Sequence, residues 1–167
     1  KVVAVELDRA SCRFWQRHLR ITDNFEVVHG DVLETDLAAL CKEKFGDGKA
    51  IACANLPYYI TTPILMHLLE SGANIDSITV MVQKEVAEKL QAPVGTRNSG
   101  AITAAVNYYG TVEMLFTVPR DSFLPPPNVD SAVIRIDVQK RYATRHAIPS
   151  TFLHAETRFF PAAEKRW

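Results

Sequence analysis

Three polar side chains each follow an apolar segment of this chain directly. Glu6 ends the first apolar run, Asp31 follows the second, and Asn55 ends the third. In open α/β sheets, ligands bind beyond the carboxyl ends of the strands. We therefore expect these three side chains to line one rim of a sheet, on neighbouring strands. Residues of these types after strands can also cap helices or close turns, and for Glu6 and Asp31 this alternative stays open.

The chemistry of each side chain suggests a role in binding a nucleoside. A carboxylate that ends the second strand of a dinucleotide-type fold accepts hydrogen bonds from ribose hydroxyls, and Glu6 fits that position. Asp31 offers an acceptor one strand further along, where an adenine amino group would lie. Asn55 offers both a carbonyl oxygen and an amide group.

A stronger indication of catalysis is the segment Asn55-Leu56-Pro57-Tyr58. Proline fixes its own backbone and carries no N–H, which leaves main-chain carbonyls free to face a cleft. An amide oxygen and a main-chain carbonyl could then accept both hydrogens of an aromatic amine, with Tyr58 stacked on the ring. Such an amine is a poor nucleophile, and two acceptors stabilise the positive charge that develops on it during attack. The alternative is an Asn-x-Pro turn beside a core tyrosine.

The elements that position these residues alternate between strands and helices. The apolar runs at 2–5 and 50–54 predict strands buried on both faces. Asp8 is expected to cap the first helix, and Thr61 or Thr62 to cap a later one. Further strands are predicted at 26–29, 77–82, 112–118 and 132–138, and further helices at 37–45, 84–90 and 99–109. This alternation predicts an open, mostly parallel α/β sheet.

Composition narrows the function little. The 167 residues fit one domain, and 19 basic side chains balance 19 acidic ones, so charge alone gives no reason to expect a nucleic-acid partner. The three cysteines form no C-x-x-C pair, which favours free thiols in a reducing compartment. The five histidines lack the spacing of metal ligands, and no apolar run is long enough to span a membrane.

Three longer segments resemble one known family. They are NLPYYITTPIL from Asn55, QKEVA from Gln83 and SFLPPPNVDSAVIRI from Ser122, in this order. Together they closely resemble the KsgA-type 16S rRNA adenine dimethyltransferases, over roughly Val2 to Val138. The Erm enzymes, which modify 23S rRNA, and the mitochondrial transcription-factor-B relatives share the general plan. The segments YYITTPI and PPPNVDS are more similar to the KsgA type than to Erm.

The resemblance implies a Rossmann-like class I methyltransferase sheet that uses S-adenosylmethionine. It implies transfer of methyl groups to N6 of adenines in 16S rRNA of the immature small ribosomal subunit, by a cytoplasmic protein that is a monomer without membrane segments. Glu6 would bind the cofactor ribose, Asp31 would contact the cofactor adenine, Val32 would line that pocket, and Asn55 would also touch the cofactor.

The same resemblance implies a set of catalytic residues. These are Asn55, Leu56, Pro57, Tyr58 and Phe123, with Phe123 packing on a flipped target base opposite Tyr58. The alternative for Phe123 is an apolar anchor for a proline-rich loop, and Pro125-Pro126-Pro127 could be a polyproline ligand.

The chain also departs from the family pattern. The glycine-rich first motif, the first strand and the C-terminal helical domain have no counterpart, so we expect this chain to bind the cofactor weakly or not at all. Residues 1–140 are interpreted as a partial catalytic domain and 141–167 as an aberrant or truncated tail. When one possible back-translation of residues 151–167 is read in a frame shifted by one base, the resulting amino-acid sequence is close to that of the family. This suggests a frameshifted or mis-assembled gene end. A non-catalytic rRNA-binding or ribosome-assembly module and an Erm-like 23S enzyme remain as alternatives.

Overall fold

The computed structural model describes residues 1–18 and 24–139, so the tail interpreted at 141–167 lies outside the described residues. The chain folds as two compact units, each built from two stretches of sequence. The first unit combines Lys1–Ala50 with Thr62–Ile75, and the second combines Ile51–Thr61 with the described residues from Asp76 to Gln139.

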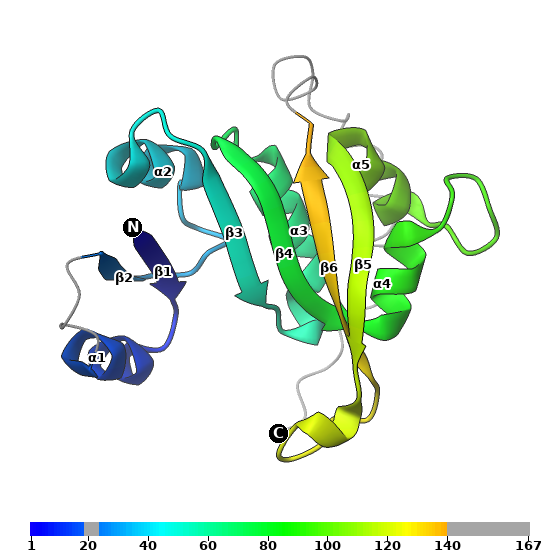
Figure 1. Ribbon diagram of the computed structural model, residues 1–167. Helices are drawn as coiled ribbons and strands as arrows, with labels where there is room; N and C mark the ends of the chain where they lie inside the picture. Colours follow the sequence, from blue (N-terminus) through cyan, green and yellow to red (C-terminus); the bar gives the residue numbers. More distant parts are fainter. Residues whose placement is uncertain (19–23, 140–167) are drawn as a thin grey trace. The chain divides into compact units, whose positions relative to one another are not determined.

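The first unit is built around a parallel pair of strands. β1 (Val2–Glu6) pairs with β2 (Phe25–His29), so that Val2 lies opposite Phe25 and Glu6 opposite His29. The helix α1 (Arg9–His18) packs against both strands. Figure 1 shows α1 beside β1 and β2. The same unit contains α2 (Leu37–Phe45) and almost all of α3 (Thr61–Glu70).

Capping side chains explain where two of these helices begin. The Asp8 carboxylate accepts a hydrogen bond from Ser11 N at 2.7 Å, which confirms the predicted cap of α1. The hydrogen bond from the Ser11 backbone is the main reason that the pKa of Asp8 lies below its usual value. Asp36 caps α2 in the same way, with Ala39 N at 2.9 Å, and Gly46 ends that helix with a φ of 64°.

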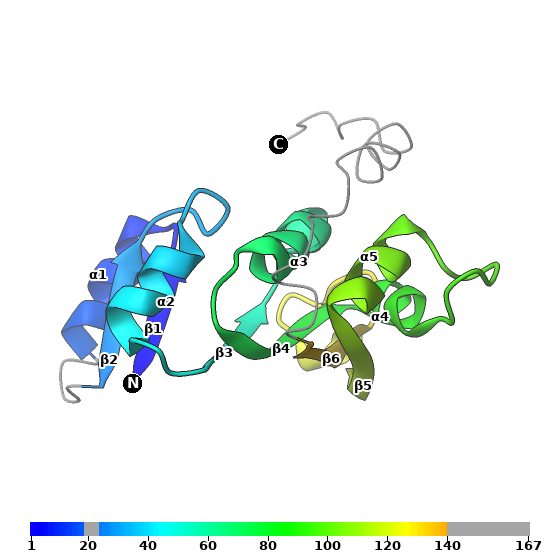
Figure 2. The ribbon, with the colours of Figure 1, turned by 90° about the horizontal axis from the view of Figure 1, so that it is seen from above.

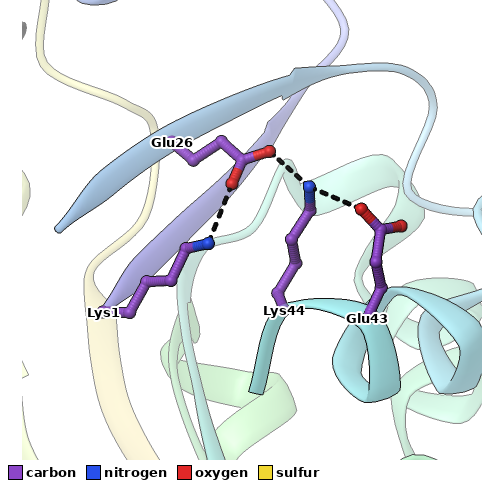
Figure 3. A network of polar contacts seen from close by, with 4 residues as sticks. All are labelled: Lys1, Glu26, Glu43 and Lys44. Carbon is purple, nitrogen blue, oxygen red and sulfur yellow. Dashed lines mark hydrogen bonds and ion pairs between the residues drawn. The ribbon is translucent and has the colours of Figure 1, made fainter. Parts of the chain in front are cut away.

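A network of charged side chains joins α2 to the strands of this unit. Figure 3 shows Glu26 of β2 between Lys1 and Lys44, with Glu43 on the far side of Lys44. Lys1 Nζ lies 3.1 Å from Glu26, and Lys44 bonds both Glu26 and Glu43. Lys44 is the main reason that the pKa of Glu26 is lowered, and Lys1 adds to the effect.

The second unit contains a four-stranded sheet in the order β3-β4-β6-β5. Its strands are β3 (Ala50–Asn55), β4 (Ile75–Gln83), β5 (Gly110–Val118) and β6 (Ser131–Val138). β6 runs antiparallel to both β4 and β5. The helices α4 (Lys84–Gln91) and α5 (Ala101–Tyr109) pack on each other and on β5, as the view from above shows (Figure 2).

The core of the second unit is apolar and closely packed. It includes the fully buried side chains of Ile78, Val80, Val82, Leu90, Val106, Ile134 and Ile136. The buried positions alternate from Ile78 onward in β4 and from Ala132 onward in β6, the pattern of a sheet whose one face is covered. In the described residues, no helix is both long and apolar enough to cross a membrane.

The elements confirm the predicted α/β class, but the expected burial of two strands was wrong. The described strands pair in a parallel two-stranded sheet and in a four-stranded sheet, where β6 runs antiparallel to both of its neighbours. The apolar runs in β1 and β3 are not buried on both faces, since Val2 is 55% and Ile51 70% exposed. An apolar run shows that a strand can be buried, but the layers that would cover it come from distant sequence.

Candidate catalytic site

The predicted catalytic segment lies at one end of the four-stranded sheet. Asn55 is the last residue of β3, and the next residue, Leu56, donates its N–H to Met81 O near the end of β4 (3.2 Å). β6 begins at this same end, because Ser131 lies opposite Gln83, the last residue of β4. Three strand ends therefore meet where the segment Asn55–Tyr58 leaves the sheet.

The structure indicates which main-chain carbonyl is available to a substrate. Pro57 O accepts hydrogen bonds from Ile60 N and from Thr61 Oγ1, both at 3.1 Å. Leu56 O accepts none from the described residues, and the Asn55 side chain is exposed and makes none with them. The acceptor pair suggested by the sequence would thus consist of Asn55 Oδ1 and Leu56 O.

The sequence predicted Thr61 or Thr62 as the cap of α3, but Thr61 does not have that role. It is the first residue of α3, and its hydroxyl donates to Pro57 O instead of accepting a helical N–H. This bond occupies Pro57 O and holds the backbone of the short 3-10 turn Tyr58–Ile60 against the start of α3. The Leu56 side chain is only 5% exposed and anchors the segment from inside.

Tyr58 is held by a residue for which the sequence predicted no role. Its hydroxyl lies 2.6 Å from Ser131 Oγ, and Ser131 is fully buried. Ser131 begins β6 and pairs with Gln83 on one side and Val118 on the other, so its own position is well fixed. The tyrosine ring is therefore tethered at its tip while its backbone is held by the turn. Ser131 lies within the segment SFLPPPNVDSAVIRI, which resembles the family. It is too far from Tyr58 in the sequence for a local pattern to predict their contact.

Phe123 lies in the connection between β5 and β6, directly after the 3-10 turn Arg120–Ser122. Asp130 ties this connection to the sheet: its carboxylate accepts from Arg120 N and its carbonyl from Lys84 N, both at 3.0 Å. Phe123 is half-buried, and among the described residues its ring makes no ring contact with Tyr58. That the two rings sandwich a base therefore stays a prediction.

A polar hollow of about 680 Å³ opens beside this connection. It is lined by both charge types, among them Lys84, Glu88, Arg120 and Asp130. None of the predicted catalytic residues lines it. The hollow therefore neighbours the connection that carries Phe123 without including the candidate catalytic group.

Glu6 and Asp31 lie at the same end of the two-stranded sheet in the first unit. Because β1 and β2 are parallel and Glu6 lies opposite His29, both carboxylates follow the carboxyl ends of their strands. Glu6 Oε1 accepts from Asp8 N at 2.8 Å, and Asp31 Oδ1 accepts from Leu33 N at 2.9 Å. Each carboxylate thus closes a local turn with one oxygen and has a second oxygen left to accept a ligand hydrogen.

The residues of the expected rim belong to two different units. Glu6, Asp31 and the half-buried Val32 belong to the first unit, and Asn55, Tyr58 and Phe123 to the second. All three cysteines are free thiols. In residues 1–18 and 24–139, no group of three or more His, Cys, Asp or Glu side chains could hold a metal ion.

Comparison with known proteins places these residues in a wider context. A family model described as ribosomal RNA adenine dimethylase matches residues 1–149. The chain is 50% identical over 141 residues to the ribosomal RNA small subunit methyltransferase A of Ligilactobacillus salivarius (strain UCC118), covering 84% of this chain and 48% of that protein. It thus spans about half the length of the curated relatives it matches.

Two solved structures have a similar fold. A dimethyladenosine transferase from Plasmodium falciparum superposes with a TM-score of 0.69 at 30% identity, covering 84% of this chain and 48% of that one. The 23S rRNA methyltransferase ErmE gives a TM-score of 0.70 at 24% identity, covering 94% of this chain and 59% of that one. The second likeness concerns the fold alone. Both support a Rossmann-like methyltransferase architecture for the described elements.

Proposed function

Because the chain belongs to the ribosomal RNA adenine dimethylase family, we propose that it is part of an enzyme that methylates N6 of adenines in small-subunit (16S) rRNA. S-adenosylmethionine is the proposed methyl donor. The proposed substrate form is the immature small ribosomal subunit, and the proposed enzyme is a cytoplasmic monomer.

One observation supports this proposal above all: the Asn55 side-chain amide and the Leu56 carbonyl, on consecutive residues at the end of β3, have no hydrogen-bond partner among the described residues. In the proposed complex, Asn55 Oδ1 and Leu56 O accept the two hydrogens of the adenine N6 amine. Both oxygens carry a partial negative charge, so they stabilise the positive charge that develops on N6 as it attacks the methyl group. The pairing of Pro57 O with Ile60 N and Thr61 Oγ1 keeps the segment from rearranging. No strong base is needed, since positioning supplies most of the effect.

The target base would be extruded from its RNA and held by aromatic rings. Tyr58 supplies one ring, whose orientation the Ser131 hydroxyl fixes. Phe123 is proposed as the second ring, carried by the connection that Asp130 anchors.

The residues of the first unit suit a nucleoside part of the cofactor. The second oxygens of Glu6 and Asp31 could accept hydrogens from ribose hydroxyls and from an adenine amine, respectively, with Val32 beside Asp31 as an apolar contact. When bound, S-adenosylmethionine would supply an electrophilic methyl group on a good leaving group.

A transfer assay tests the proposal directly. The protein that contains this chain is incubated with S-adenosylmethionine labelled in its methyl group and with immature 30S particles. The RNA is then digested to nucleosides. We expect label in N6-methylated adenosines of 16S rRNA, and a loss of this label in the Asn55→Ala variant.

The alternatives give different results in the same assay. Label only in 23S rRNA would assign the chain to the Erm-like activity and overturn the 16S proposal. RNA binding without any transfer, under conditions where a known dimethyltransferase labels the same particles, would favour a non-catalytic module.

A further inference from the structure

The helix α1 carries a row of arginines that the proposed chemistry does not use. Arg9, Arg13 and Arg17 are exposed and follow one another at intervals of four residues. Four residues of helix advance by about 6 Å and turn by about 40°, so the three side chains form one stripe along the helix. No acidic residue lies within α1 to offset them.

These three arginines differ from most cations of the described residues in having no ion pair. Lys1, Lys42, Lys44, Lys89, Arg120 and Arg135 each lie within ion-pair distance of a carboxylate. Asp8, the acidic residue next to the stripe, directs its carboxylate at Ser11 N. A chain with no net charge thus presents, on a single helix face, three arginines that have no ion pair among the described residues.

Aromatic side chains lie beside the arginine stripe. The Phe14 ring stacks on the His18 ring with centroids 4.1 Å apart, and the Trp15 ring meets Phe14 edge-on at 5.1 Å. Phe14 is 50% and Trp15 42% exposed, while Cys12 is the buried residue of the helix. With 3.6 residues per turn, Phe14 and His18 fall on the side of α1 away from Cys12, next to Arg17.

We propose that this outward face of α1, formed by Arg9, Arg13, Arg17 and the Phe14–His18 stack, docks the sugar-phosphate backbone of the RNA substrate. The inference rests on the proposed function, which makes RNA the macromolecule that this chain meets. Planar guanidinium groups match phosphate oxygens in pairs, and a row of them follows a polyanionic strand. Exposed aromatic rings beside such a row are common in proteins that bind single-stranded nucleic acid, because the bases stack on them.

The test measures RNA binding and its salt dependence with the whole chain. Filter binding of a radiolabelled 16S rRNA transcript is recorded from low to physiological salt for the wild type and for the R9Q/R13Q/R17Q variant. The matched control, K42Q/K89Q/R97Q, removes the same charge from exposed positions on other elements. Far-UV circular dichroism and the thermal midpoint show that each variant is folded.

We expect the α1 variant to bind at least about tenfold more weakly near physiological salt. The slope of log K against log salt should fall by about 2 to 3, because each lost phosphate contact removes roughly 0.7 to 0.9. The control should keep the wild-type slope. An α1 variant that binds with wild-type affinity and slope, a control that loses as much, or a wild type that does not bind the transcript overturns the proposal.

The same samples separate this inference from the proposed function. Methyl transfer by the wild type, with unaltered RNA binding by the α1 variant, would reject the docking face and leave the enzymatic proposal intact. Absence of transfer, with binding lost only in the α1 variant, would reject the activity and keep the docking face. If sedimentation shows a dimer that Phe14→Ser dissociates without changing RNA binding, the face belongs to a second copy of the chain, and the proposal fails.

Discussion

At the scale of single residues, the site depends on which oxygens remain unpaired. The sequence indicated an amide and a carbonyl in Asn55–Tyr58 but could not say which carbonyl. The structure removes Pro57 O from consideration, since Ile60 N and Thr61 Oγ1 already occupy it. The candidate acceptor pair is therefore formed by adjacent residues, Asn55 and Leu56.

Removing the side-chain acceptor should slow the chemical step more than it weakens RNA binding. For Asn55→Ala we expect kcat to fall by about 100- to 1,000-fold, the range found when one preorganised hydrogen-bonding group is lost from a charge-stabilising site. The KM for RNA should change little, because most of the RNA contacts lie elsewhere. Single-turnover methyl transfer measures the effect, with Asn98→Ala, an exposed asparagine in a loop, as the control. Equal rates for the two variants would contradict the assignment.

The Tyr58–Ser131 hydrogen bond makes a second prediction at this scale. Without its partner the ring gains rotational freedom, so Ser131→Ala should lower kcat/KM by about fivefold, the equivalent of roughly 1 kcal/mol for one hydrogen bond. Tyr58→Phe should lower it to a similar extent, and the double variant should be no worse than either single one. Fully additive effects would show that the bond does not position the ring.

A suitable control for Ser131→Ala is Ser77→Ala. Ser77 is also a buried serine of this sheet, but it lies towards the opposite end of β4, opposite Asp137. Its loss tests whether removal of any buried hydroxyl from the sheet lowers transfer. We expect Ser77→Ala to leave kcat/KM at the wild-type value.

Ser131 also shows where prediction of the site from sequence ends. The types and order of Asn55, Leu56, Pro57 and Tyr58 were enough to suggest their chemistry. The partner of the tyrosine hydroxyl lies 73 residues away and meets it only because β6 lies beside β4. Such a contact depends on strand order, which apolar periodicity does not encode.

At the scale of elements, helix boundaries were the most predictable feature. α2 occupies 37–45 as predicted, because Asp36 offers a cap at one end and Gly46 a left-handed residue at the other. These signals act within a few residues and do not depend on the rest of the fold. The exposure of Val2 and Ile51 depends on distant segments, and this was the point at which sequence-based prediction was wrong.

The charge network around Glu26 predicts how acid affects the first unit. Hydrogen bonds from Lys44 and Lys1 lower the pKa of Glu26 below its ordinary value of 4.5. A carboxylate with a lowered folded-state pKa stabilises the protein above 4.5, and this contribution is lost as the pH falls from there through the folded-state pKa. The thermal midpoint should therefore drop as the pH falls below 4.5.

The Glu26→Gln variant isolates this contribution. It cannot titrate, so its midpoint should lie below that of the wild type at pH 7, and the difference should shrink as the pH approaches 3. Thermal unfolding followed by circular dichroism gives both curves. A difference that stays constant with pH would show that the network does not contribute through the Glu26 charge.

At the scale of the whole molecule, the four-stranded sheet has two outer strands, β3 and β5. β3 is an outer strand of the four-stranded sheet, and its Ile51 side chain is largely exposed. The sequence has no net charge and a pI near 7.1, so electrostatic repulsion between copies is weakest at neutral pH. Under these conditions, an outer strand is a site at which edge-to-edge pairing between copies can occur.

A charge on the outer strand should therefore reduce self-association more than the same charge placed elsewhere. We expect Ile51→Lys to lower static light scattering of concentrated protein at pH 7, because a lysine on an outer strand opposes pairing with another strand. The matched control is Val94→Lys, which replaces a similarly exposed apolar residue in the loop after α4 and adds the same charge. If both variants reduce scattering equally, net charge alone is responsible. A larger effect of Ile51→Lys identifies the outer edge of β3 as the surface through which copies of the chain associate.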